Sequence, residues 1–121
     1  MFSPAVILFA HGAREPEWAQ PLESVCDRLR AAGTRVELAF LEIMSPSLDE
    51  AARKLVAEGH EIVTIVPLFL AQGGHLKRDL PAMVAKIRER HAKTEFRVTP
   101  ALGDAPEIIA AITEWVQRAA R

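Results

Sequence analysis

The sequence predicts an α/β fold in which a small, four-stranded parallel sheet carries helices on both faces. Short apolar runs alternate with segments of helical periodicity, four of each, as in a series of βα units. The first and third runs are almost continuously apolar, as in central strands that are covered on both sides. Glycines and prolines fall between the runs and the periodic segments, where turns and helix ends are expected.

The four apolar runs are the candidate strands. The second run alternates more than the others, with Glu37 and Glu42 among apolar neighbours, and this alternation indicates a less buried strand. The runs are AVILFA (5–10), RVELAFLEI (35–43), EIVTIVPLFL (61–70) and FRVTPAL (96–102).

Four segments with apolar residues on one helical face follow these strands. Pro46 after Ser45 is predicted to be a first-turn proline behind an N-cap. Asp104 with Glu107 is predicted to form a capping box. The apolar stripes are Leu22, Val25, Cys26 and Leu29; Leu48, Ala51, Ala52, Leu55 and Val56; Leu76, Leu80, Met83, Val84 and Ile87; and Ile108, Ile109, Ile112, Trp115 and Val116.

Right-handed connections and strand burial together favour the strand order 2-1-3-4, with the two most apolar strands in the middle. The connections after strands 1 and 3 then leave in opposite directions, and open sheets bind ligands at such a switch point. His11 follows the first strand and His75 follows the third. We therefore expect both histidines to face one crevice, in a single domain formed by residues 1–121.

Composition narrows the classes of function. The 121 residues are half apolar and carry a formal net charge of −1, which argues against a nucleic-acid or membrane partner recognised by broad electrostatics. Cys26 is the only cysteine, so no intramolecular disulfide can form and a reducing compartment is expected. Its place in an apolar stripe predicts an inert core thiol. No signal peptide or membrane-spanning run is recognised, so we expect a cytoplasmic protein.

His11 and His75 are the first candidates for chemistry. Neutral imidazole is a common ligand of cobalt, nickel, iron and zinc, and it also exchanges protons near neutral pH. Either histidine alone fits a hydrogen-bonded loop residue, but two at a switch point, each close to glycine, favour a shared function. Glu42, at the end of the second strand, is a candidate metal ligand or proton acceptor, with a surface ion pair as the alternative.

The loops around the histidines contain the glycines and apolar residues expected at the entrance of a binding site. Gly12, Gly73 and Gly74 allow a close backbone approach to a ligand or a positive φ, although ordinary loop geometry explains them equally well. They do not form the phosphate-binding fingerprint of dinucleotide sites. Of the apolar residues 68–70, two are expected to complete the strand, and the third can offer an apolar wall to a flat ligand or a second subunit.

Three cations flank the two histidines. Arg14, Lys77 and Arg78 indicate an anionic ligand, since the rest of the chain is almost neutral. The alternative is that they are solvated charges in the first turns of two helices, where the helix dipole disfavours cations. His60 and His91 lie away from the switch point and are expected to be structural or exposed.

Five short segments, in order along the whole chain, match the pattern of a known family. They are His11-Gly12, FLEIMSPSLDEA (40–51), VPLFLAQGGH (66–75), DLP (79–81) and PALGDAP (100–106). With them the chain resembles the short, CbiX-like sirohydrochlorin cobaltochelatases, which are class II chelatases related to the sirohydrochlorin ferrochelatases. One position departs from the family pattern, because Ala13 stands where the family usually has serine after His-Gly.

The resemblance implies a metal chelatase, a lyase that inserts a divalent metal into a uroporphyrinoid tetrapyrrole for cobalamin or sirohaem. The metal is a substrate, with Co²⁺ as the first candidate and Ni²⁺ and Fe²⁺ as alternatives, and no organic cofactor is expected. By motif position, His11 and His75 are the implied metal-binding and catalytic residues, with Glu42 as a weaker catalytic assignment. Short members resemble half of a two-lobed chelatase and are expected to form homodimers. The expected substrate-binding residues are Arg14, Gly73, Gly74, Lys77 and Arg78.

Two other functions fit part of the pattern. A phosphohistidine carrier domain is also small and α/β, with His-Gly after its first strand, and it would use His11 but give His75 no role. A metal- or tetrapyrrole-binding module without turnover would use both histidines. A histidine phosphatase fits poorly, because Ala10 precedes His11 where that family has arginine.

Overall fold

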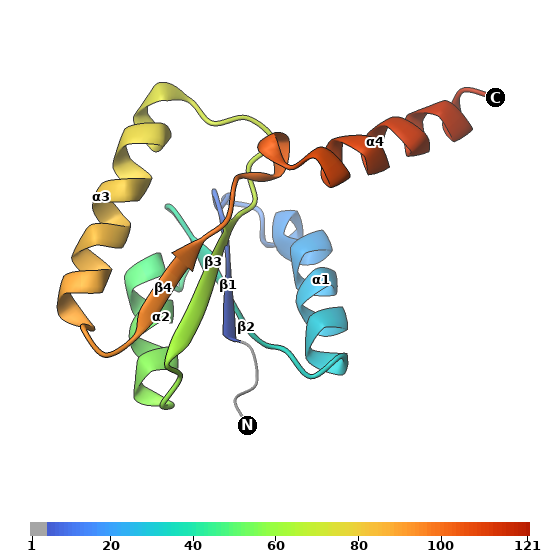
Figure 1. The fold of residues 1–121 in the computed structure, drawn as a ribbon. Helices are drawn as coiled ribbons and strands as arrows, with labels where there is room; N and C mark the ends of the chain where they lie inside the picture. Colours follow the sequence, from blue (N-terminus) through green and yellow to red (C-terminus); the bar gives the residue numbers. More distant parts are fainter. Residues whose placement is uncertain (1–4) are drawn as a thin grey trace.

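Four parallel strands form one sheet in the order β2-β1-β3-β4, which confirms the predicted fold class and strand order (Figure 1). The structure is a computed structural model that describes residues 5–121. The strands are β1 (Ala5–Ala10), β2 (Arg35–Phe40), β3 (Ile62–Pro67) and β4 (Glu95–Val98). The helices are α1 (Gln20–Ala31), α2 (Leu48–Ala57), α3 (Gly74–Arg90) and α4 (Pro106–Ala119), with short 3-10 turns η1 (Pro16–Ala19) and η2 (Leu102–Asp104).

Helices cover both faces of the sheet. On one face, α2 and α3 pack over all the strands in a core that includes Ile65, Leu55 and Leu80. On the other face lies α1, whose Cys26 packs with Val36 of β2 in a smaller core (Figure 1). Because side chains alternate along each strand, they contribute to two separate apolar layers, one on each face of the sheet.

The second to fourth strands are shorter than the apolar runs that predicted them, because each run turns out of the sheet at its carboxyl end. The chain leaves β2 after Phe40 and β3 after Pro67. Backbone pairing to β1 continues briefly, since Leu41 N donates to Ala10 O at 2.8 Å. The ends of the apolar runs thus become the loops of the carboxyl edge.

Two predicted helix starts are wrong. Ser47, not Ser45, is the N-cap of α2: its hydroxyl accepts from Glu50 N and its own N donates to the Glu50 carboxylate, both at 3.1 Å. Asp104 forms no capping box, because it ends η2, and α4 begins at Pro106 behind Ala105. A proline at the first helical position already has the required φ and needs no donor there.

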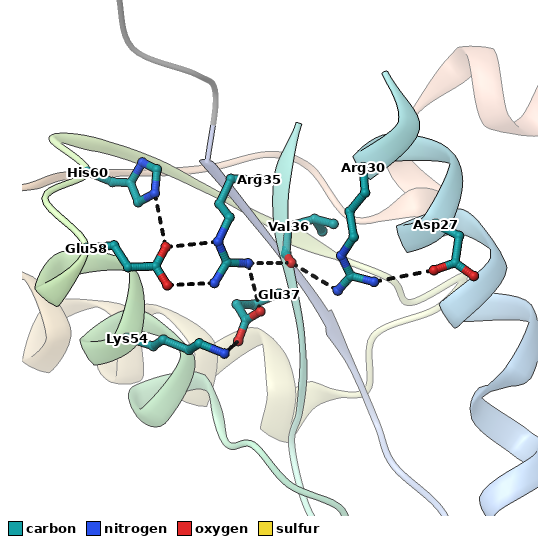
Figure 2. Close-up of polar contacts among 8 residues, drawn as sticks. All are labelled: Asp27, Arg30, Arg35, Val36, Glu37, Lys54, Glu58 and His60. Carbon is teal, nitrogen blue, oxygen red and sulfur yellow. Dashed lines mark hydrogen bonds and ion pairs between the residues drawn. The ribbon is translucent and has the colours of Figure 1, made fainter. Parts of the chain in front are cut away.

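An ion-pair network lies at the amino end of β2, opposite the carboxyl edge of the sheet (Figure 2). Arg35 donates to both carboxylate oxygens of Glu58 at 2.9 and 2.8 Å and to Glu37 at 2.9 Å. Lys54 also pairs with Glu37 at 3.1 Å, and His60 lies 3.4 Å from Glu58. His60 is therefore a structural residue, as expected.

The C-terminal helix α4 leaves the body of the molecule at the carboxyl edge and extends away from it (Figure 1). It begins directly after η2, and none of its residues is buried. The sequence predicts its helical span and apolar stripe correctly, but the stripe does not pack on this chain's own sheet. No helix within residues 5–121 is long and apolar enough to cross a membrane.

Candidate active site

His11 lies directly after β1, at the carboxyl edge of the sheet, with its side chain exposed. Its ring packs edge-on against Phe69, with ring centroids 4.7 Å apart at an interplanar angle of 78°. Phe69 is buried just beyond β3, and the two exits run side by side because Leu68 N donates to Phe9 O at 2.8 Å. The edge-on contact fixes one side of the imidazole and leaves the exposed side for a ligand.

Glu42 reaches the same edge from β2. Its backbone N donates to His11 O at 3.0 Å. Gly12 makes this approach feasible: its φ is +95°, and a Cβ there would lie 2.0 Å from Glu42 O. The side chain of Glu42 is exposed, and no hydrogen bond joins it to either imidazole within the described part of the chain. For Gly12 the positive-φ alternative is therefore confirmed, and the close approach that the structure shows is to another loop of the protein.

His75 lies in the first turn of α3, also with its side chain exposed. Its helix follows β3, the strand adjacent to β1, so both histidines occupy the carboxyl edge on neighbouring strands. No hydrogen bond links the two imidazoles within residues 5–121. Across the same residues, no three side chains of the types His, Cys, Asp and Glu converge to hold a metal ion.

Gly73 and Gly74 begin α3, with Gly73 as its N-cap. Neither has a positive φ, so that alternative is wrong for this pair, because the N-cap takes the ordinary extended conformation at φ −70° and ψ 164°. A Cβ at either position would meet nothing within 4 Å. The pair therefore presents a bare backbone to the outside, which leaves the close approach of a ligand feasible.

β3 ends at Pro67, so the expectation that two of the apolar residues 68–70 complete the strand is wrong. Their burial nevertheless separates two of them from the third. Phe69 is buried and Leu68 is half-buried, whereas Leu70 is 62% exposed. Sequence reasoning missed two further exposed apolar residues in the loops of this edge, Ile43 after β2 and Trp18 after β1. Ile43 adopts a positive φ of 70°, which is rare for a β-branched residue and stores strain. Ile43 ends the second apolar run (35–43), so the sequence carried no signal that it would be an exposed loop residue.

The predicted cations lie on the same side of the molecule but differ in their contacts. Arg14 is exposed in the loop after His11, and Lys77 is exposed in the first turn of α3. Arg78 Nε donates to Gly74 O at 3.3 Å, one turn back along its helix. The first turn of α3 contains no acidic residue. This helix start therefore combines the positive end of its dipole with two cations, an arrangement that favours an anion.

The loop that carries Leu70 is fixed to η2 by a backbone contact. Gly103 N donates to Phe69 O at 3.2 Å, and a Cβ on Gly103 would lie 1.6 Å from Leu70 O. Only glycine fits so close to another backbone. The start of α4 is thereby fixed beside the residue that packs on His11.

The remaining candidates lie outside this edge. Cys26 is the residue of α1 that is buried against the sheet, and burial raises the pKa of its thiol, as expected of an inert core cysteine. His91 caps the C-terminal end of α3, where its ring packs near Phe96 with centroids 6.2 Å apart. It is a structural residue.

Comparison with known proteins decides the family. The family model described as CbiX matches residues 5–119. This chain belongs to the CbiX family. A sirohydrochlorin cobaltochelatase of Sulfolobus acidocaldarius is 32% identical over 114 residues, which span 94% of this chain and 90% of that protein. A protein of the same name from Saccharolobus solfataricus is 34% identical over 81% of each chain. The resemblance seen in the sequence motifs is thus confirmed.

Solved structures support the same placement of this CbiX-family chain. The crystal structure of a CbiX protein from Marinobacter aquaeolei VT8 superposes with a TM-score of 0.84 at 32% identity, over 96% of both chains. The sirohydrochlorin chelatase SirB from Bacillus subtilis, solved with cobalt, superposes with a TM-score of 0.78 at 22% identity. This chain spans 51% of that SirB chain, so the likeness covers about half of a longer protein of the same fold.

Proposed function

We propose that this CbiX-family protein is a sirohydrochlorin chelatase, an enzyme that inserts a divalent metal into a uroporphyrinoid tetrapyrrole. The observation that carries the proposal is the position of two exposed histidines on adjacent strand exits, in a chain whose relatives are sirohydrochlorin cobaltochelatases. Co²⁺ is the first candidate substrate metal, and Ni²⁺ and Fe²⁺ remain candidates because similar ligands bind all three.

In this proposal, His11 and His75 hold the metal on its way to the ring. Imidazole nitrogens bind such metals while leaving coordination positions open for the incoming pyrrole nitrogens. Each inserted metal ion displaces the pyrrole N–H protons, which must pass to a base. A histidine or the exposed carboxylate of Glu42 can accept them if the bound ring lies within hydrogen-bond reach.

The same edge offers matching contacts for the rest of the macrocycle. Leu70, Ile43 and Trp18 are exposed apolar side chains suited to its flat face. The bare backbone of Gly73 and Gly74 permits a close approach. The peripheral carboxylates would be bound by the cations around this edge, Arg14, Lys77 and Arg78.

We further propose that residues 1–121 form one chelatase-like domain, equivalent to one lobe of a longer chelatase, and that two copies associate as a cytoplasmic homodimer. Two observations support the dimer. Within residues 5–121, too few ligand side chains converge to complete a metal site. The SirB chain with the same fold is about twice as long. A second copy would supply the missing half of the cleft.

The direct test is to mix the protein with sirohydrochlorin and Co²⁺ and to follow the absorption change on insertion. We expect His75→Ala and His11→Ala to lose about 100-fold or more of the rate, because each removes a metal ligand and a proton acceptor. His60→Ala, which changes a histidine at the opposite end of the sheet, is the matched control and should keep the wild-type rate. A His75→Ala protein as fast as wild type would contradict the proposal.

CbiX-family membership argues against the phosphohistidine carrier, which would also leave His75 unused. Incubation with a phosphorylated donor tests it, because a carrier would become phosphorylated on His11. Measuring turnover distinguishes the non-catalytic binding module from the chelatase. Stoichiometric binding of metal or tetrapyrrole without insertion would favour the module over the chelatase.

A further inference from the structure

The orientation of the His11 imidazole needs an explanation. A metal-binding histidine ordinarily donates its second ring N–H to a carboxylate or a carbonyl, and this hydrogen bond fixes the orientation of the ring. Within residues 5–121, no such hydrogen bond is made by His11. An exposed side chain samples several staggered rotamers unless a neighbouring group restricts it. The aromatic ring that packs against this imidazole belongs to Phe69.

Phe69 is itself held in place by several contacts. Its side chain is only 3% exposed and belongs to the larger core, between the sheet and the helices α2 and α3. The ring of Phe9 meets it edge-on, with centroids 5.8 Å apart at an interplanar angle of 89°. Gly103 N donates to Phe69 O at 3.2 Å, which fixes the backbone as well. This buried ring is therefore a fixed surface against which an exposed imidazole can be aligned.

The contact between imidazole and phenyl ring is closer than the contact between the two phenyl rings of the core. The centroids of His11 and Phe69 are 4.7 Å apart, whereas those of Phe9 and Phe69 are 5.8 Å apart. Edge-to-face aromatic pairs are favourable at centroid distances of about 4.5 to 7 Å. A phenyl ring offers no lone pair to a divalent metal, so it can hold the imidazole in place without competing for the ion.

We infer that Phe69 is the positioning residue of His11, and that its ring holds the imidazole in the orientation in which it meets a divalent metal. The aromatic contact takes the place of the hydrogen bond that usually orients a histidine ligand. Phe69 is buried and acts on the metal only through His11. The inference rests on the proposed function, in which the metal is a substrate, but the orientation of the ring can be tested without a tetrapyrrole.

The expected size of the effect follows from the number of orientations open to the imidazole. A free histidine side chain has about three staggered positions about its first torsion and about two about its second. The apparent affinity for a ligand falls in proportion to the population of the binding-competent orientation. Loss of the phenyl ring should therefore weaken the binding of Co²⁺ about three- to sixfold. This loss is smaller than that expected for His11→Ala, which removes the ligand itself.

The first experiment observes the imidazole protons of His11 by NMR in the metal-free protein, with His11→Ala to assign them. The nearby phenyl ring should displace these signals in wild type and should show cross-relaxation with them. Phe69→Leu keeps an apolar side chain in the core and should return the signals to values typical of an unpacked histidine. Phe69→Met fills more of the space and serves if the leucine variant does not fold. Wild-type signals without displacement would overturn the inference.

Phe96→Leu is the matched control. Phe96 is also 3% exposed in the same core, and its ring lies near a different histidine, with its centroid 6.2 Å from that of His91. Phe96→Leu should change the signals of His91 and leave those of His11 unchanged, whereas Phe69→Leu should do the opposite. If both variants change both histidines alike, the core has merely loosened, and this result would overturn the positioning role.

The second experiment titrates each protein with Co²⁺ alone and measures the dissociation constant by calorimetry. Phe69→Leu should bind about three- to sixfold more weakly than wild type, and Phe96→Leu should match wild type. Equal affinities of Phe69→Leu and wild type would overturn the inference. The insertion assay is run on the same proteins. Binding of Co²⁺ that depends on Phe69, without insertion, would refute the proposed function and leave the positioning role standing, whereas insertion at equal rates and affinities with and without Phe69 would do the reverse.

Discussion

Gly12 follows His11 and packs against the backbone of Glu42, just beyond β2. This residue shows how the candidate site depends on backbone conformation. Its positive φ turns the chain after β1, and the missing Cβ leaves room for the carbonyl oxygen of Glu42. The hydrogen bond from Glu42 N to His11 O then ties the two loops together. The position of His11 therefore depends on the conformation of Gly12 as well as on β1.

Gly12→Ala is expected to destabilise the protein by about 2 kcal/mol or more, because alanine is strained at this φ and its Cβ would meet Glu42 O at 2.0 Å. Urea unfolding measures the loss. Gly73→Ala is the matched control, since its φ of −70° suits alanine and its surroundings are open. Its stability should change by less than about 0.5 kcal/mol. Equal stability of the two variants would contradict this account of Gly12.

At the scale of single residues, the sequence predicts position better than conformation. His11 and His75 reach one edge because the strand order alone requires it, and the strand order follows from apolar patterning. The exposure of Leu70 follows from the end of the strand. The strained backbone of Ile43 was not predictable, because isoleucine disfavours a positive φ and only the surrounding loop imposes it.

At the scale of elements, the four strands and four helices were predictable, but several of their ends were not. Ser45 and Ser47 both flank Pro46, and either fits an N-cap in sequence. The reciprocal bonds between Ser47 and Glu50 decide the choice, and they depend on where the chain leaves β2. Helix ends are set by such tertiary details more than by local preference.

The network at the amino end of β2 makes the stability of this element depend on pH. Burial alone would raise the pKa of Glu37, but hydrogen bonds from Arg35 and Lys54 outweigh it and leave this pKa below its usual value of 4.5. The pKa of Glu58 is lowered by Arg35 as well, and the pKa of Arg35 is raised by its hydrogen bonds to Glu58 and Glu37. Carboxylates held in this way stabilise the fold above their usual pKa and lose that contribution as the pH falls through the lowered value.

Glu37→Gln should therefore cost about 1 kcal/mol at pH 7, because it removes a half-buried charge from Arg35 and Lys54. The difference from wild type should shrink as the pH falls below about 4.5, where the carboxylate of the unfolded chain takes up its proton, and should vanish below the lowered pKa of the folded state. Urea unfolding at pH 7, 5, 4 and 3 gives both quantities. Glu89→Gln, an exposed change on α3 without an ion pair in the described residues, should match wild type throughout. A constant difference across this range would refute the assignment.

At the scale of the whole molecule, the sequence does not determine what covers the apolar stripe of α4. The apolar stripe of α4 predicts that something covers this helix, but periodicity carries no information on which chain supplies the cover. The same holds for β3, whose run was apolar enough for a strand buried on both faces.

If the proposed homodimer forms, unfolding and dissociation are coupled, and the midpoint of thermal unfolding should rise with protein concentration. A series over about two decades of concentration, followed by circular dichroism, measures this dependence. A midpoint that does not change with concentration would mean that each chain folds independently of its partner.

The contact of Gly103 with Leu70 carries a consequence for how such proteins diverge. One position without a side chain anchors both the loop that leads to the second histidine and the root of the projecting helix. A side chain there would displace the loop before His75 and the start of α4 together, because both segments meet at this backbone contact. Related chains that differ elsewhere in these loops are therefore expected to keep glycine at this position.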